Sequence, residues 1–178
     1  MCKVFFIADT HFGHEAIIHY ENRPFENIDE MTTTLINNWN KVVSAEDTVF
    51  LLGDFSAYDK DATISICNRL NGHKILIMGN HDMGNEKYYY DCGFESVSKY
   101  PIIYDNFWIL SHEPMYINSN MPYANIFGHV HGNPLYTDCS KQSFCVSAER
   151  INYTPVEFNE IKRKMVITEW GERNVRNN

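Results

Sequence analysis

Short apolar runs that end in polar residues dominate the first two thirds of the chain. Five of these runs predict buried strands, because they lack the polar alternation of a half-exposed strand: 4–8, 49–52, 75–78, 109–111 and 125–127. Apolar residues at helical spacing predict helices over 31–43 and 59–70, and residues 12–29 are expected to form loops. This strand, helix, strand order favours parallel pairing through right-handed crossovers.

The pattern changes after Gly93 to short strands separated by short turns. The runs 94–97, 102–104, 107–111, 126–127 and 143–146 predict a second, partly antiparallel sheet, and a closing helix is expected over 158–167. The expected fold class is α/β, because helices and strands alternate at the start of the chain. At 178 residues we expect one domain over 1–168, followed by a polar C-terminal tail over 169–178.

Composition limits the classes of binding partner and the cellular compartment that we expect. The net charge of −8 disfavours long nucleic acid, which the protein would repel. The five cysteines contain no Cys-x-x-Cys pair and no apolar run is long enough to span a bilayer, so we expect a cytoplasmic protein without membrane contact. The oligomeric state is left open.

Polar residues with metal-binding chemistry directly follow the predicted strands. They form five groups in chain order: Asp9-Thr10-His11, Gly53-Asp54, Gly79-Asn80-His81-Asp82, His112 and Gly128-His129-Val130-His131. Ligands of open α/β sheets bind outside the carboxyl ends of the strands, so we expect these groups to converge.

The groups supply enough ligands for two divalent metal ions. We expect Asp54 to bridge them, with Asp9, His11 and His131 completing one site and Asn80, His112 and His129 the other. Mixed oxygen and imidazole ligands favour Mn, Fe, Zn or Ni over Mg or Ca, and Mn is our first choice. Such a pair of ions can hold a hydroxide that attacks a phosphoester.

Four further residues have weaker assignments. His81 completes neither shell, so we expect it to protonate the leaving oxygen or to stabilise charge on the phosphoryl group. Asp82 either orients the His81 ring or caps the following segment. Arg23 and His14 either bind the substrate phosphate or form, respectively, a surface salt bridge and a loop hydrogen bond. The run Tyr88 to Tyr90 is expected to pack against the core rather than to stack on a base.

The ordered set of motifs, spanning about residues 3–132, resembles the calcineurin-like metallophosphoesterase superfamily. The segments His11-Phe12-Gly13-His14 and Arg23-Pro24-Phe25 are similar to those of its compact, cap-free bacterial and phage members. The resemblance implies a four-layer αββα sandwich of two mixed sheets flanked by helices. It also implies a dinuclear metal centre and hydrolysis of phosphodiesters or phosphomonoesters.

The predicted function is therefore metal-dependent hydrolysis of a small phosphoester. A metal-bridging hydroxide would attack phosphorus while His81 assists the leaving group, and a diester is preferred over a monoester because no cap insertion closes the site. A nuclease is the first alternative. The rival from another class is a non-catalytic scaffold that binds partner proteins, but such a scaffold would not require every ligand to be kept.

Overall fold

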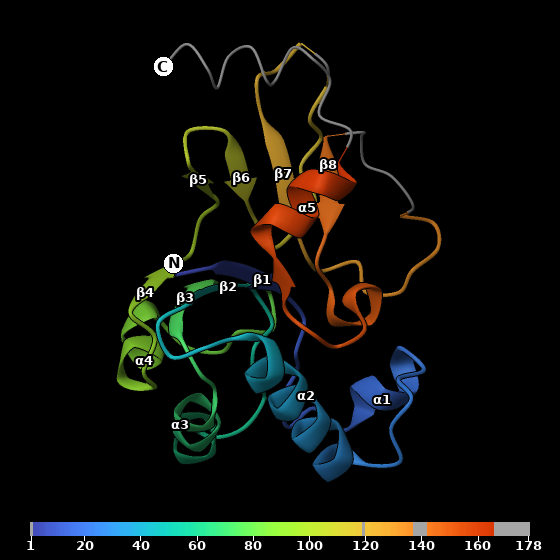
Figure 1. The fold of residues 1–178 in the computed structure, drawn as a ribbon. Coiled ribbons are helices and arrows are strands. Elements are labelled where there is room, and N and C mark those ends of the chain that lie inside the picture. The colour runs from blue at the N-terminus through green and yellow to red at the C-terminus, as the bar shows by residue number, and fades with distance from the viewer. Residues whose placement is uncertain (1, 119, 137–141, 166–178) are drawn as a thin grey trace.

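The computed structural model describes residues 2–118, 120–136 and 142–165 (Figure 1). Its helices are α1 (Ala16–Tyr20), α2 (Ile28–Val42), α3 (Lys60–Arg69), α4 (Glu86–Asp91), α5 (Phe158–Lys164) and the 3₁₀ helix η1 (Ala148–Ile151). Its strands are β1 (Val4–Ile7), β2 (Thr48–Leu52), β3 (His73–Ile77), β4 (Ser96–Ser98), β5 (Ile102–Tyr104), β6 (Trp108–Leu110), β7 (Ala124–Phe127), β8 (Ser143–Cys145) and β9 (Val156–Glu157).

The first sheet has the order β4-β3-β2-β1-β9. Strands β1 to β4 run parallel, as predicted for the start of the chain, and β9 pairs antiparallel with β1. Ile7, Leu51 and Leu76 lie side by side in register. The three central strands therefore end level, and the loops that follow them leave the sheet at one edge.

The second sheet has the order β5-β6-β7-β8, in which only the β5–β6 pair is antiparallel. The prediction that residues 94–97 open this sheet was wrong, because β4 joins the first sheet beside β3. A short apolar run indicates a buried strand but not the sheet that the strand joins, because strand pairing is decided by contacts distant in sequence.

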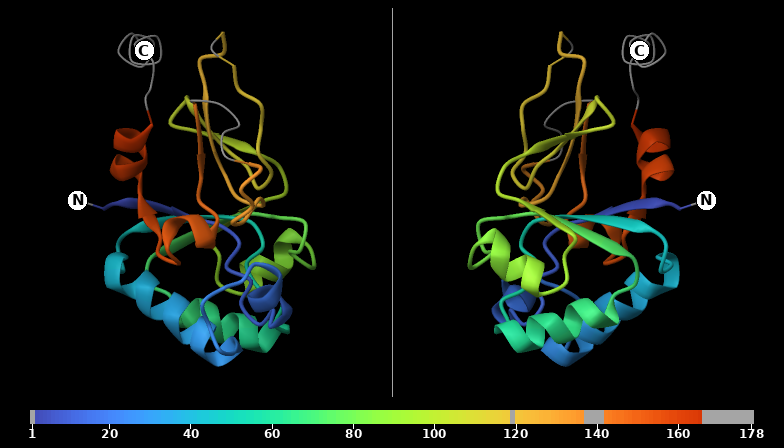
Figure 2. Two further views of the ribbon diagram at one scale, coloured as in Figure 1. Left: turned by 90° about the vertical axis from the view of Figure 1, so that its right-hand side faces the viewer. Right: turned by 90° about the vertical axis from the view of Figure 1, so that its left-hand side faces the viewer.

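Two hydrophobic cores hold the layers together. Phe5 and Ile7 of β1 belong to the core beneath α2, whereas Phe6 and Ala8, on the opposite face, belong to the core shared with the second sheet and α5. Figure 2 shows α1 to α4 on one side of the first sheet and the second sheet, together with α5, on the other. The predicted α/β fold with two mixed sheets and flanking helices is confirmed.

Two short helices were missed by the sequence pattern. Helix α1 lies in the stretch predicted as loops, and α4 begins after Asn85, whose side chain accepts a hydrogen bond from the N–H of Tyr88. Both are too short for a helical period to stand out. Within α4, Tyr89 is buried in the core as expected, while Tyr90 is exposed.

The C-terminal predictions are only partly covered. Helix α5 ends at Lys164, and the rest of the predicted closing helix, with the tail 169–178, lies outside the described residues. The single domain over 1–168 stays a prediction. None of the helices in the described ranges is long and apolar enough to cross a bilayer.

Candidate metal centre

The loops at the carboxyl ends of five strands converge on one site. Asp9 follows β1, Asp54 follows β2, Asn80 follows β3, His112 follows β6, and the segment with His129 follows β7. The first three strands belong to one sheet and the last two to the other. The site therefore lies where the two sheets meet, and it joins the groups that the sequence predicted to converge.

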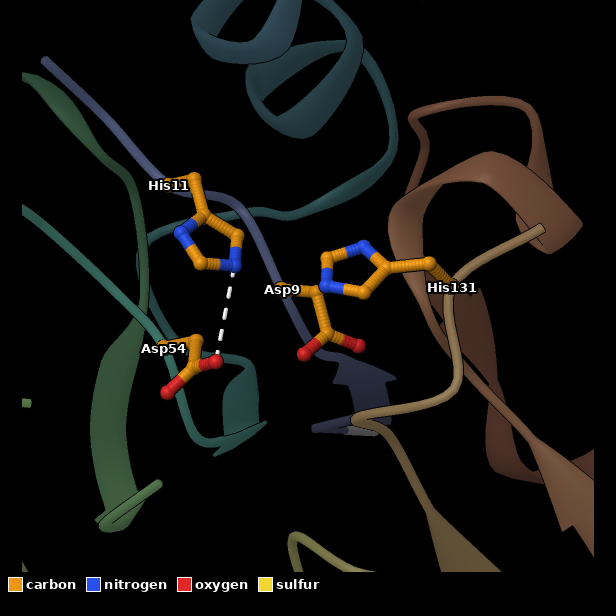
Figure 3. Close-up of side chains that lie close together, drawn as sticks. All are labelled: Asp9, His11, Asp54 and His131. Atoms are coloured by element: carbon orange, nitrogen blue, oxygen red, sulfur yellow. Dashed lines mark ion pairs between the residues drawn. The ribbon is translucent and has the colours of Figure 1, made fainter. Parts of the chain in front are cut away.

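One half of the site is the more buried one, and we call it the enclosed half: Asp9, His11, Asp54 and His131. Each of these residues places a ligand atom within 4.8 Å of those of the other three (Figure 3). Asp9, His11 and Asp54 are at most 2% exposed. The Nε2 atom of His11 is buried without a hydrogen-bond partner among the described residues, which a metal ion would supply.

The other half, which we call the open half, consists of Asn80, His112 and His129. Nε2 of His112 lies 2.9 Å from Oδ1 of Asn80, and Nδ1 of His129 lies 3.0 Å from the same oxygen. The two imidazole nitrogens are 3.1 Å apart. Asn80 and His129 are exposed, whereas His112 is buried.

Asp54 faces both halves with a single oxygen atom. Its Oδ2 lies 3.4 Å from Nε2 of His11 in the enclosed half and 3.4 Å from Nε2 of His112 in the open half. Its other oxygen, Oδ1, accepts a hydrogen bond of 2.8 Å from the N–H of His81. This arrangement orients the carboxylate between the halves, as a bridging ligand requires.

Many of the expected ligands in these loops have a left-handed backbone conformation. Five of the seven expected ligands have φ between 48° and 69°: Asp9, His11, Asp54, His129 and His131. Such conformations are costly for residues other than glycine and gather at functional sites. Gly53 and Gly79 admit the close approach, because a Cβ atom at either would collide with the side chain of His112 or Asp54, respectively.

Hydrogen bonds from outside the ligand set fix the imidazole rings. Nδ1 of His112 lies 2.8 Å from the carbonyl oxygen of Leu52, so this nitrogen donates and Nε2 faces the other residues of the open half. In the same way Nδ1 of His131 lies 3.0 Å from Oε1 of Glu149. Sequence reasoning missed Glu149. The available signal was its position just past the predicted strand 143–146, where the other site residues also follow strands.

Burial and neighbouring charges act in opposite directions on the pKa values. Burial raises the pKa of Asp9 to about 6 and lowers that of His11 to about 4. Burial would also raise the pKa of Asp54, but the neighbouring imidazoles of His11 and His112 hold it well below its usual range. For His112 the lowering by burial is outweighed by Asp54 and Asp9, and its pKa rises to about 9. A metal ion would replace this proton, since a ligating imidazole is neutral.

Arg23 does not reach the site as a phosphate ligand, so this prediction was wrong. Its guanidinium is fully buried and forms an ion pair of 2.7 Å with Glu149, and it donates to the carbonyl oxygens of Thr10 (3.1 Å) and Asp9 (2.7 Å). These bonds hold the loop after β1 from behind. The alternative of a surface salt bridge was wrong as well, because this ion pair is buried.

Asp82 is also directed away from the reacting region. Its carboxylate accepts hydrogen bonds from the N–H groups of Asp54, Phe55 and Gly79 at 2.8–2.9 Å and from the Tyr89 hydroxyl at 3.2 Å. The structure records no hydrogen bond between Asp82 and the His81 ring among the described residues, so the predicted orienting role was wrong. Asp82 instead ties the loop after β2 to the loop after β3.

His81 and His14 lie at the mouth of the site. The His81 ring is exposed, with its centre 5.4 Å from that of His11 and 6.1 Å from that of His14. Nδ1 of His14 lies 3.2 Å from Nδ1 of His11, which agrees with the predicted loop hydrogen bond.

A cavity of about 280 Å³ opens over both halves of the site. Its lining includes the two rings at the mouth together with Ile17, Tyr20 and Glu21 of the segment around α1. A larger cavity of about 610 Å³ lies at the β1–β9 edge, away from the metal-binding residues. Charged side chains there pair with one another, as Lys3 does with Glu157 at 3.1 Å, so the smaller cavity is the candidate substrate site.

Comparisons with known proteins agree with this geometry. The family model described as calcineurin-like phosphoesterase matches residues 2–172. An uncharacterized protein of Methanocaldococcus jannaschii is 38% identical, with 90% of each chain covered. The crystal structure of a protein of unknown function from Aquifex aeolicus has a TM-score of 0.74 at 27% identity and covers 92% of this chain and 99% of its own. The structure of a Pseudomonas putida nuclease shares the fold, with a TM-score of 0.50 at 20% identity over 72% of this chain and 61% of its own. The chain therefore belongs to the calcineurin-like phosphoesterase family, and this membership implies a hydrolase that uses divalent metal ions.

Proposed function

We propose that this protein is a dinuclear metal phosphoesterase that prefers phosphodiesters to phosphomonoesters. The observation that carries the proposal is the position of Asp54 Oδ2, at 3.4 Å from an imidazole nitrogen in each half of the site. A carboxylate oxygen placed between two ligand clusters suits a bridge between two metal ions. A non-catalytic scaffold gains nothing from this arrangement, which costs five left-handed backbone conformations.

Seven residues would hold the two ions. Asp9, His11 and His131 serve the enclosed half, Asn80, His112 and His129 serve the open half, and Asp54 serves both. Bound ions would polarise the phosphoryl oxygens and make water a stronger nucleophile at neutral pH. The oxygen and imidazole ligands favour Mn, with Fe, Zn or Ni as alternatives.

His81 acts on the leaving group. Its ring is exposed in the cavity wall beside His11, and it is not needed as a ligand. An alkoxide that leaves phosphorus needs a proton, and an imidazole supplies one near neutral pH. His14, at the same mouth, binds a phosphoryl oxygen of the substrate in this proposal.

A nuclease is the second candidate, and two observations favour it. The P. putida protein that shares the fold is a nuclease. Exposed aromatic side chains follow two of the motifs, Tyr116 after His112 and Tyr136 after His131, where bases stack in proteins that bind single strands. The net charge of −8 weighs against long nucleic acid, so we place a small phosphodiester first. The cysteine pattern favours the cytoplasm as the compartment.

Hydrolysis of two chromogenic esters tests the proposal. Metal-stripped protein reloaded with Mn is expected to cleave bis-p-nitrophenyl phosphate faster than p-nitrophenyl phosphate. His81→Ala is expected to lose about 10²–10⁴-fold in kcat while binding two equivalents of Mn. His73→Ala is the matched control, since His73 is an exposed histidine at the opposite end of β3.

Three outcomes would contradict the proposal. Absence of turnover with two bound metal ions would favour the scaffold. Cleavage of the monoester alone would indicate a phosphatase. Faster cleavage of single-stranded DNA than of the small diester would favour the nuclease.

A further inference from the structure

One wall of the cavity contains no metal ligand. Tyr20, at the end of α1, and Glu21, the next residue, line the cavity together with the metal-binding side chains, and we call this pair the α1 wall. Figure 1 shows α1 beyond the carboxyl end of β1. The organic part of a substrate bound at the metal centre would meet this wall.

Glu21 presents a negative charge to the cavity. One of its carboxylate oxygens lies within 4.8 Å of a ring nitrogen of His131 and an oxygen of Glu149. The charge of Glu149 is compensated by Arg23 at 2.7 Å. The Glu21 carboxylate, in contrast, forms no hydrogen bond or ion pair with another residue in the described ranges, and its side chain is half-buried. An anion in the cavity would therefore experience its field, and a second charge on that anion would double the repulsion.

Tyr20 presents an exposed ring next to this carboxylate. It is 72% exposed, although it touches the site through His14, whose ring centre lies 6.4 Å away at an interplanar angle of 77°. An exposed aromatic ring at the mouth of a cavity gains free energy when a flat group packs against it. Phosphomonoesters carry one organic substituent, whereas diesters carry two, so a diester has a substituent to spare for this ring.

We propose that the α1 wall selects singly charged phosphodiesters with an aromatic or nucleoside substituent. This inference rests on the proposed function and adds the basis of its preference. A phosphodiester carries one negative charge, whereas a phosphomonoester carries between one and two at neutral pH. Glu21 disfavours the additional charge, and Tyr20 favours the additional substituent. The two residues act by different forces but shift selectivity in the same direction.

Binding of two inert probes tests the wall without turnover. Phenylphosphonate and methyl(phenyl)phosphinate both carry one phenyl group but differ in charge, two units against one at pH 8.5. Calorimetric titration of the Mn-loaded protein gives the ratio of the two dissociation constants, to which the metal ions contribute equally in wild type and variant. In Glu21→Gln the ratio of the two dissociation constants is expected to shift toward the phosphonate by about tenfold. Glu15→Gln, at an exposed position before α1, is the matched control.

Tyr20 is tested with the same probes. Tyr20→Ala is expected to weaken binding of both probes by about three- to tenfold, because both carry the phenyl group, whereas Tyr20→Phe keeps wild-type affinity. Steady-state kinetics provide the second measurement. The kcat/KM ratio of bis-p-nitrophenyl phosphate to p-nitrophenyl phosphate is expected to fall in Glu21→Gln and in Tyr20→Ala.

The possible failures are distinguishable. A charge ratio that stays within twofold of the wild type in Glu21→Gln, with normal hydrolysis and an unchanged melting temperature, overturns the role of the wall and leaves the proposed function standing. A tenfold shift of this ratio toward the phosphonate in Glu21→Gln, in a protein that hydrolyses no ester, supports the wall and overturns the proposed function.

Discussion

The two halves of the metal centre differ in burial and in charge. Asp9, His11 and Asp54 of the enclosed half are at most 2% exposed, whereas Asn80 and His129 of the open half are exposed. The enclosed half has two carboxylates, and the open half adds only a neutral amide oxygen to two imidazoles. A site with more negative charge binds a cation more tightly, and the attraction is screened less where solvent is excluded. We therefore expect the enclosed half to take up the first metal ion and the open half to take up a second, weaker one.

The contacts that hold the ligands in place also differ between the two halves. The enclosed half is held from behind by a chain of contacts from His131 to Glu149 to Arg23. The open half is held by a carbonyl oxygen, that of Leu52, on the His112 ring. We therefore expect a division of labour, in which the more buried half positions one ion and the more exposed half holds an ion that is more accessible to solvent.

The strongest test removes the residue that both halves share. Asp54→Asn keeps the size of the side chain but removes the charge between His11 and His112. We expect kcat to fall by at least about 10³-fold and both ions to bind more weakly. Measurement of bound Mn and of diester hydrolysis checks this, with Asp61→Asn as an exposed control. Retention of two tightly bound ions in Asp54→Asn would contradict the bridging role.

The next test distinguishes a residue that stabilises the loops of the site from a residue that acts on the substrate. Asp82→Asn replaces one of the two accepting oxygens with an NH2 group, so two of the four donors that face this side chain lose their acceptor. We expect the free energy of unfolding of the metal-free protein to fall by about 3 kcal/mol in urea denaturation. His81→Ala, one residue earlier and exposed, should change it by less than about 0.5 kcal/mol. Equal stability of the two variants would argue against a structural role for Asp82.

The sequence indicated which residues converge, because these residues follow strands. Apolar runs located β1, β2, β3, β6 and β7, and the polar residues just past them are the ones that converge. Parallel strands that end level bring such residues together whatever the helices between them do. For this reason the convergence of Asp9, Asp54 and Asn80 could be predicted without knowledge of the loops.

The surroundings of the ligands could not be derived in the same way. Arg23 and Glu149 are 126 positions apart, and no local pattern indicates that their side chains meet in the interior. The direction of the Asp82 carboxylate depends on backbone N–H groups of two loops, which a motif does not describe. Left-handed backbone at non-glycine residues is likewise imposed by tertiary contacts.

A third test acts on the enclosed half alone. Glu149→Gln removes the carboxylate that accepts from His131 and leaves the buried Arg23 without its counter-ion. We expect the first Mn equivalent to bind about 10- to 100-fold more weakly, while the second is less affected. Calorimetric titration of metal-stripped protein resolves the two steps, and Glu46→Gln at an exposed position is the control. A variant that weakens the second step more than the first would reverse our assignment of the halves.

The smallest expected effect comes from making the halves more alike. Asn80→Asp adds a charge to the open half, whose amide oxygen lies 2.9 Å from His112 and 3.0 Å from His129. We expect the second Mn ion to bind about tenfold more tightly, because each added carboxylate charge strengthens the attraction. The same charge cancels part of the positive field that would hold an anionic ester, so diester hydrolysis should decrease although the metal is bound more firmly. Calorimetric titration of Mn and hydrolysis kinetics on one preparation check the expected rise in metal affinity and the expected fall in diester hydrolysis. If Asn80→Asp raised hydrolysis along with affinity, the open half would be limited by metal occupancy, and the difference in charge between the halves would serve no catalytic purpose.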